Sequence, residues 1–158
     1  MIKNTKGFLL VEIVIAVALI SIAFIALLGI GLLTLNVSNS VNKQTQADFL
    51  IKEEFEALRN FRDGTSWSTN GLGVVNTGIG NPYHLAIVSN KWAIVAEQEV
   101  SGSFTKKIIF DKVSRDVNNN IEEIYNASGD DPDTIKVTAT VAWSNKILTS
   151  IMYLTNWK

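Results

Sequence analysis

The hydrophobic pattern of the first part of the chain predicts one long apolar helix. Residues 8–35 are almost entirely apolar, and Glu12 is the only charged side chain among them. As a helix with a rise of ~1.5 Å per residue, this run is longer than the hydrocarbon core of a bilayer, which is ~30 Å thick. Lys3 and Lys6 precede the run, whereas the next basic residue after it is Lys43. We therefore expect a single membrane-spanning helix with its N-terminus in the cytoplasm.

The pattern then changes from continuously apolar to helically periodic. Apolar positions recur mostly every three or four residues, and charged residues mostly occupy the remaining face. The apolar set is Val37, Val41, Leu50, Ile51, Phe55, Leu58 and Phe61, and the charged set is Lys43, Asp48, Lys52, Glu53, Glu54, Glu56, Arg59 and Arg62. Asp63 followed by Gly64 is a typical helix stop. We predict one helix over residues 8–62 whose amphipathic half, residues 36–62, buries its apolar stripe against a soluble domain.

The remainder of the chain, residues 63–158, has a β-strand pattern after an initial loop. Residues 63–82 are rich in Gly, Ser, Thr and Asn without a sustained period, which predicts a long loop. The predicted strands are residues 83–89, 91–100, 104–117, 134–144 and 146–157. In the fourth of these, Ile135, Val137, Ala139, Val141 and Trp143 alternate with Lys136, Thr138 and Thr140. A short connection at residues 144–146 then predicts an antiparallel hairpin, so the expected fold class is α+β, a long helix packed on an antiparallel sheet.

Composition and charge exclude several classes of function. The formal net charge is -1, so the chain lacks the basic footprint of a nucleic-acid-binding protein. It contains no cysteine, which removes disulfides and thiolate nucleophiles. Its single histidine, His84, cannot form a catalytic histidine pair or a multi-histidine metal site within one chain. We therefore expect that the chain is not an enzyme and that it has no cofactor and no nucleic-acid partner.

Two acidic segments are candidates for calcium-binding loops. Residues 116–123 carry oxygen-bearing side chains at alternate positions, like the first half of an EF-hand loop. However, Ile121 stands where that loop needs glycine, and Ala127 stands where it needs a bidentate glutamate. Residues 130–133 offer three further carboxylates, which we interpret as a solvated acidic loop, with a calcium site as the alternative. No metal site is predicted.

Three interpretations of the apolar N-terminus compete. A secretory signal has an apolar region of roughly 7–15 residues, about half the length found here. A plain membrane anchor accounts for the length and for the basic residues Lys3 and Lys6, but it leaves Glu12 unexplained. The stretch "KGFLLVE", residues 6–12, resembles the type III signal of type IV pilins and pseudopilins. Leu9 departs from the Ser or Thr common at its position in that family, a departure that does not affect the expected cleavage.

The resemblance implies roles for particular residues. A prepilin peptidase would cut after Gly7, removing residues 1–7 as a cytoplasmic leader, and the new N-terminal Phe8 would be N-methylated. Glu12 would become the fifth residue of the mature chain and would pair with the N-terminal amine of a neighbouring subunit. An acidic side chain at a bilayer centre costs roughly 2.5–3.5 kcal/mol, so a partner of this kind would explain the carboxylate. Glu12 lies near the cytoplasmic end of the run, however, and the alternative is a tolerated interfacial glutamate that the helix macrodipole stabilises by ~0.3–1 kcal/mol.

The resemblance also implies a fold, partners and a location. In a pilin fold, residues 8–35 would form the filament core and residues 36–62 would pack on a globular β-rich head, residues 63–158. Residues 63–82 would be the variable loop of this head. The expected partners are the prepilin peptidase, other pilin subunits, the inner-membrane assembly platform and membrane lipid. The chain would be a single-pass protein of the cytoplasmic membrane before assembly. After assembly it would lie at the cell surface in an extracellular filament that serves adhesion or motility.

The C-terminal part carries a second, looser resemblance. The segments "DDPDT", "KVTATVAWS" and "YLTNW" are similar to PilV-like minor pilins, which favours a minor over a major subunit. The expected function is therefore a structural subunit of a type IV pilus or a related pseudopilus. The alternatives are a pseudopilin of a type II secretion or DNA-uptake system, and a single-span anchor that carries an extracellular binding module.

Overall fold

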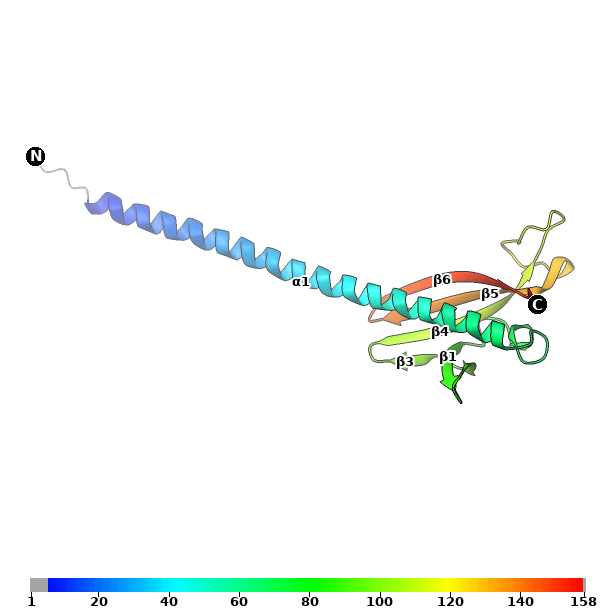
Figure 1. The fold of residues 1–158 in the computed structure, drawn as a ribbon. Helices are drawn as coiled ribbons and strands as arrows, with labels where there is room; N and C mark the ends of the chain where they lie inside the picture. Colours follow the sequence, from blue (N-terminus) through cyan, green and yellow to red (C-terminus); the bar gives the residue numbers. More distant parts are fainter. Residues whose placement is uncertain (1–5, 158) are drawn as a thin grey trace, which may run out of the picture. The chain divides into compact units, whose positions relative to one another are not determined.

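A computed structural model describes the backbone of residues 6–157 and the side chains of residues 10–157. One long helix, α1 (Lys6–Gly64), is followed by the short 3-10 helix η1 (Leu72–Val74) and then by strands (Figure 1). The strands are β1 (Tyr83–Val88), β2 (Lys91–Ala96), β3 (Glu99–Ser101), β4 (Phe104–Ser114), β5 (Asp130–Trp143) and β6 (Lys146–Thr155), with a second 3-10 helix, η2 (Ala127–Gly129), before β5. The predicted α+β class, a long helix packed on an antiparallel sheet, is confirmed.

The chain forms two compact units, one up to Asn42 and one from Lys43 onward. Helix α1 contributes its apolar half and residues 36–42 to the first unit, and the rest of its amphipathic half to the second. The second unit also contains all the strands and therefore the hydrophobic core.

The sheet is antiparallel, with strand order β2-β1-β4-β5-β6 and β3 paired to the end of β4. Strands β4 and β5 pair along most of their length, with Ile108 opposite Ala139 and one register shift after Lys112. Strands β5 and β6 pair from Trp143 opposite Lys146 to Thr134 opposite Thr155, so the predicted hairpin is confirmed. The alternation in β5 places its apolar residues on the buried face, because successive side chains of a strand point to opposite faces.

The core lies between the amphipathic half of α1 and one face of the sheet. Helix residues Ala47, Ile51 and Leu58 are buried in it together with Phe110 and Val137 of the sheet. Figure 1 shows this part of α1 lying along the sheet. Burial of apolar side chains at roughly 25 cal/mol per Å² stabilises this packing, which explains why the helix face that meets the sheet is apolar.

Two features of the predicted stripe are corrected by the structure. Val37 and Val41 are exposed, and the buried stripe begins at Ala47. Glu54, which the periodicity placed on the polar face, is buried, whereas Phe49 is exposed. The reason is that Glu54 has charged and backbone partners on the sheet, described below, which make its burial possible.

The predicted strand over residues 91–100 is also corrected. It is two strands, β2 and β3, separated by a bend in which Glu97 has a φ angle of 77°. β2 pairs with β1, and β3 pairs with β4. Local periodicity cannot show such a change of partner, because the strand that each half pairs with lies elsewhere in the sequence.

Candidate functional site

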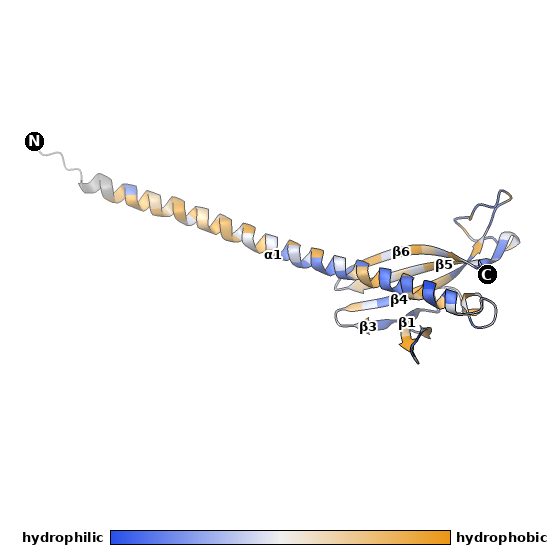
Figure 2. Cartoon of the chain, in the orientation of Figure 1, coloured by the Kyte–Doolittle hydropathy of each residue, from blue (hydrophilic) through white to orange (hydrophobic). Residues whose placement is uncertain are grey.

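The apolar half of α1 is the most unusual surface of the chain. The large hydrophobic side chains from Leu10 to Leu35 are each between 55% and 71% exposed. Figure 2 shows this half of the helix as almost continuously hydrophobic, whereas the second half alternates between hydrophobic and hydrophilic residues. The helix is long and apolar enough to cross a membrane. Because apolar surface is unfavourable in water, this segment requires lipid or other apolar helices around it.

Glu12 interrupts this surface near its N-terminal end. Its side chain is exposed, and it forms no hydrogen bond or ion pair with the side chains of residues 10–157. The backbone of Lys6, Gly7 and Phe8 belongs to α1, while the side chains of Lys6 and Phe8 lie outside the described part of the chain, as does Lys3 entirely. Along a helix, Phe8 and Glu12 are about one turn apart, at ~1.5 Å per residue.

The two hydroxyl side chains within the same apolar segment do bond to their own helix. Ser21 donates its Oγ hydrogen to the carbonyl of Val17 at 2.8 Å, and Thr34 donates its hydroxyl hydrogen to the carbonyl of Ile30 at 2.9 Å. Such bonds remove the cost of placing a hydroxyl in an apolar environment. Glu12 therefore differs from these residues, since it is charged and its carboxylate has no donor on the described helix.

A second polar arrangement is buried in the head, and sequence reasoning missed it. Nζ of Lys106 on β4 lies 2.7 Å from Glu54 of α1 and 2.8 Å from Glu99 of β3. The side chains of Lys106 and Glu54 are 9% and 3% exposed. The other carboxylate oxygen of Glu54 accepts a hydrogen bond from the backbone N–H of Leu85 at 3.1 Å. The sequence signal that could have indicated this arrangement is the charged Lys106, which stands at an inward-facing position between apolar residues of the predicted strand.

The electrostatics of this arrangement favour the charged lysine. Burial by itself lowers the pKa of Lys106, but the hydrogen bonds and charges of Glu54 and Glu99 outweigh it, and the pKa lies above its ordinary value. A buried ion pair is stable only when each charge is paired and bonded, a condition met here by the contacts of Glu54 with Leu85 and Lys106.

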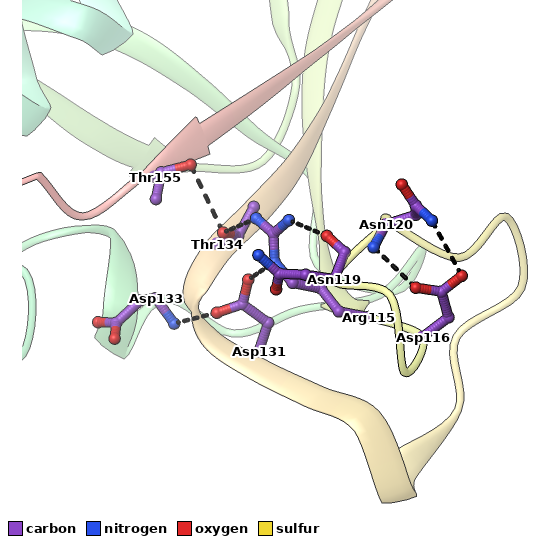
Figure 3. A network of polar contacts seen from close by, with 8 residues as sticks. All are labelled: Arg115, Asp116, Asn119, Asn120, Asp131, Asp133, Thr134 and Thr155. Carbon is purple, nitrogen blue, oxygen red and sulfur yellow. Dashed lines mark hydrogen bonds and ion pairs between the residues drawn. The ribbon is translucent and has the colours of Figure 1, made fainter.

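Carboxylates of both acidic segments accept hydrogen bonds from other groups of the protein (Figure 3). Asp116 accepts hydrogen bonds from the backbone N–H of Asn120 at 2.8 Å and of Asn118 at 2.9 Å, and these bonds lower its pKa. Asp131 accepts a bond from Arg115 at 2.6 Å. Arg115 also donates to the carbonyl of Asn119 at 3.0 Å. Asp116 therefore stabilises the loop between β4 and β5, as aspartates commonly do in turns. The expected acidic loop over residues 130–133 is corrected, because these residues begin β5 and Asp131 is paired with Val113 of β4.

His84 lies near the start of β1, where the sequence places it. Its Nδ1 is 3.0 Å from the carbonyl oxygen of Glu97. No group of three or more metal-ligating side chains suited to a metal ion occurs in residues 10–157. The histidine therefore has a structural contact at the bend between β2 and β3.

Comparisons with known proteins found no match to this chain among family models, curated proteins or solved structures.

Proposed function

We propose that the chain is a structural subunit, of the minor-pilin kind, in a type IV pilus or a related pseudopilus. The observation that carries this proposal is the exposed apolar half of α1, interrupted near its N-terminal end by the exposed side chain of Glu12. A filament made of such helices would bury this surface in its core. The same surface would lie in lipid before assembly, which the length and hydrophobicity of the helix support.

Glu12 would set the position of one subunit against the next. In a low-dielectric environment, the interaction of two opposite charges depends steeply on their distance. If cleavage after Gly7 frees the amine of Phe8, a carboxylate of an incoming subunit has a cationic partner on a subunit already in place. This pairing would make one axial register more favourable than the others.

The first experiment determines the N-terminus of the mature protein. Intact-mass and peptide mass spectrometry of the protein purified from its native membrane should show a chain that begins at N-methylated Phe8. A chain that retains Met1 and Lys3 would contradict the processing step and would support a membrane-anchored binding module instead.

The second experiment tests the role of Glu12. Glu12→Gln removes the charge and keeps the shape, so we expect normal insertion and cleavage but at least tenfold less subunit in sheared filaments, because the charge pair is lost. Glu53→Gln, at an exposed position of the same helix, is the matched control. Normal incorporation of Glu12→Gln would exclude the proposed pairing.

A third experiment identifies the machine. Deletion of the chromosomal copy should reduce piliation, transformation by external DNA or protein secretion, and the affected process assigns the subunit to a pilus, a DNA-uptake system or a type II secretion system. If all three processes are unchanged in the deletion strain, the filament proposal is contradicted.

A further inference from the structure

The hairpin of β1 and β2, residues 83–96, is weakly joined to the rest of the sheet. β1 and β2 pair with each other over six residue pairs, from Tyr83 opposite Ala96 to Val88 opposite Lys91. β1 pairs with β4 through one residue pair, Tyr83 opposite Ile108. Backbone ladder bonds therefore hold the hairpin to itself much more extensively than to β4.

The carboxylate of Glu54 contacts β1 beyond the point where β1 leaves β4. Its Oε2 accepts the backbone N–H of Leu85, and its Oε1 lies 2.7 Å from Nζ of Lys106. Glu54 belongs to α1 and Lys106 to β4, so one side chain links the helix, the hairpin and the central sheet. Hydrogen bonds to charged groups are roughly twice as strong as neutral ones, and this bond is buried.

The base of the hairpin is a bend at Glu97, whose backbone makes two contacts. The N–H of Glu97 donates to the carbonyl of Pro82 at 2.7 Å, and the carbonyl of Glu97 lies 3.0 Å from Nδ1 of His84. Glu97 has a φ of 77°, a conformation that residues other than glycine rarely adopt. The chain thus changes direction sharply at this residue, where β2 ends and β3 begins.

From these three observations we propose that the β1–β2 hairpin is a flap that opens separately from the rest of the head and is held closed by Glu54. Opening breaks the bond of Leu85 to Glu54 and the single pair with β4, and it exposes the apolar side chains of Leu85, Trp92 and Ile94 that pack on the core. Because Glu54 lies on α1, displacement of the helix relative to the sheet would release the flap. This device does not depend on the proposed filament role.

Hydrogen exchange of the full chain in detergent micelles tests the flap. Glu54→Gln keeps an acceptor for Leu85 but removes the charge, and Lys106 retains its pair with Glu99. Amides of residues 84–95 should exchange about tenfold faster than in the parent, while amides of β5 are unchanged. The control Glu53→Gln should leave both regions as in the parent. An equal increase in the flap and in β5, or no increase in either, overturns the proposal.

The unaltered chain provides an independent measurement that does not require the variant to fold. In low concentrations of urea, the free energy of the opening that exchanges the flap amides should fall less steeply with urea than the free energy of opening for β5. The reason is that opening of the flap exposes less surface. If the flap and β5 exchange with the same free energy and the same dependence on urea, they form one cooperative unit and the proposal is wrong.

Discussion

The buried charges of Lys106 and Glu54 are paired with each other. Lys106 contacts two glutamates, and Asp131 accepts a bond from Arg115 at 2.6 Å. Removing one partner from a buried pair is more costly than removing both, because the remaining charge is left without a partner. Two predictions follow from these contacts.

The first concerns Lys106. Lys106→Met leaves the buried carboxylate of Glu54 without its cation, so we expect a loss of about 3–5 kcal/mol in the free energy of unfolding. Lys107→Met, at the next position and on the opposite face of β4, should change that free energy by about 0.5 kcal/mol or less. Urea denaturation followed by circular dichroism measures both, and equal losses would show that Lys106 has no special role.

The second prediction concerns acid stability through Asp131. Burial raises the pKa of this carboxyl, but hydrogen bonds from Arg115 and from the N–H of Asp133 outweigh it, so its pKa in the folded state is below the ordinary value. The stability that Asp131 contributes is therefore present above the unfolded-state pKa of about 3.9 and is lost as pH falls through the folded-state pKa.

Asp131→Asn should consequently show a shallower loss of melting temperature than the parent as pH falls from about 5 to about 2. Thermal denaturation at a series of pH values measures this slope. Asp48→Asn, on an exposed part of α1, is the control and should follow the parent. Parallel curves for Asp131→Asn and the parent would contradict the assignment.

At the scale of elements, the two halves of α1 differ in which of their apolar side chains are exposed and which are buried. Its first half presents apolar side chains all round, while its second half buries Ala47, Ile51 and Leu58 on the sheet. Most helix stability in proteins comes from packing of this kind rather than from intrinsic propensity.

Leu58→Ala should therefore destabilise the head by about 2–5 kcal/mol, because Leu58 is fully buried and its removal leaves a cavity. Phe49→Ala, at an exposed position of the same helix, should cost about 0.5 kcal/mol or less. Chemical denaturation of both variants measures the difference. A larger loss for Phe49→Ala than for Leu58→Ala would contradict the observed packing face.

At the scale of the whole molecule, the two compact units have different requirements. The unit from Lys43 onward contains the hydrophobic core, whereas the described part of the unit up to Asn42 is helix whose large apolar side chains are exposed. A chain of residues 43–158 should therefore be soluble and monomeric without detergent and should unfold in one cooperative transition. Size-exclusion chromatography and thermal denaturation test this. Aggregation of this fragment, or a melt without a cooperative transition, would show that the head depends on the apolar half.

The elements of this protein were largely predictable because they depend on local periodicity. The helix predicted over residues 8–62 is observed over Lys6–Gly64, and the hairpin of β5 and β6 follows directly from the alternation in "KVTATVAW". The roles of Gly7, Phe8 and Glu12 stay predictions that rest on a motif, to which the structure adds the exposure of Glu12 and of the apolar surface around it.

The amino-acid sequence alone determined that the chain has a membrane-length apolar helix, an amphipathic continuation and an antiparallel sheet, because each has its own hydrophobic period. Tertiary structure decided that Glu54 is buried, that Lys106 joins it to Glu99, and that residues 91–100 divide between two partner strands. The physical reason is that burial of a charge depends on partners far away in the sequence, which no local pattern encodes.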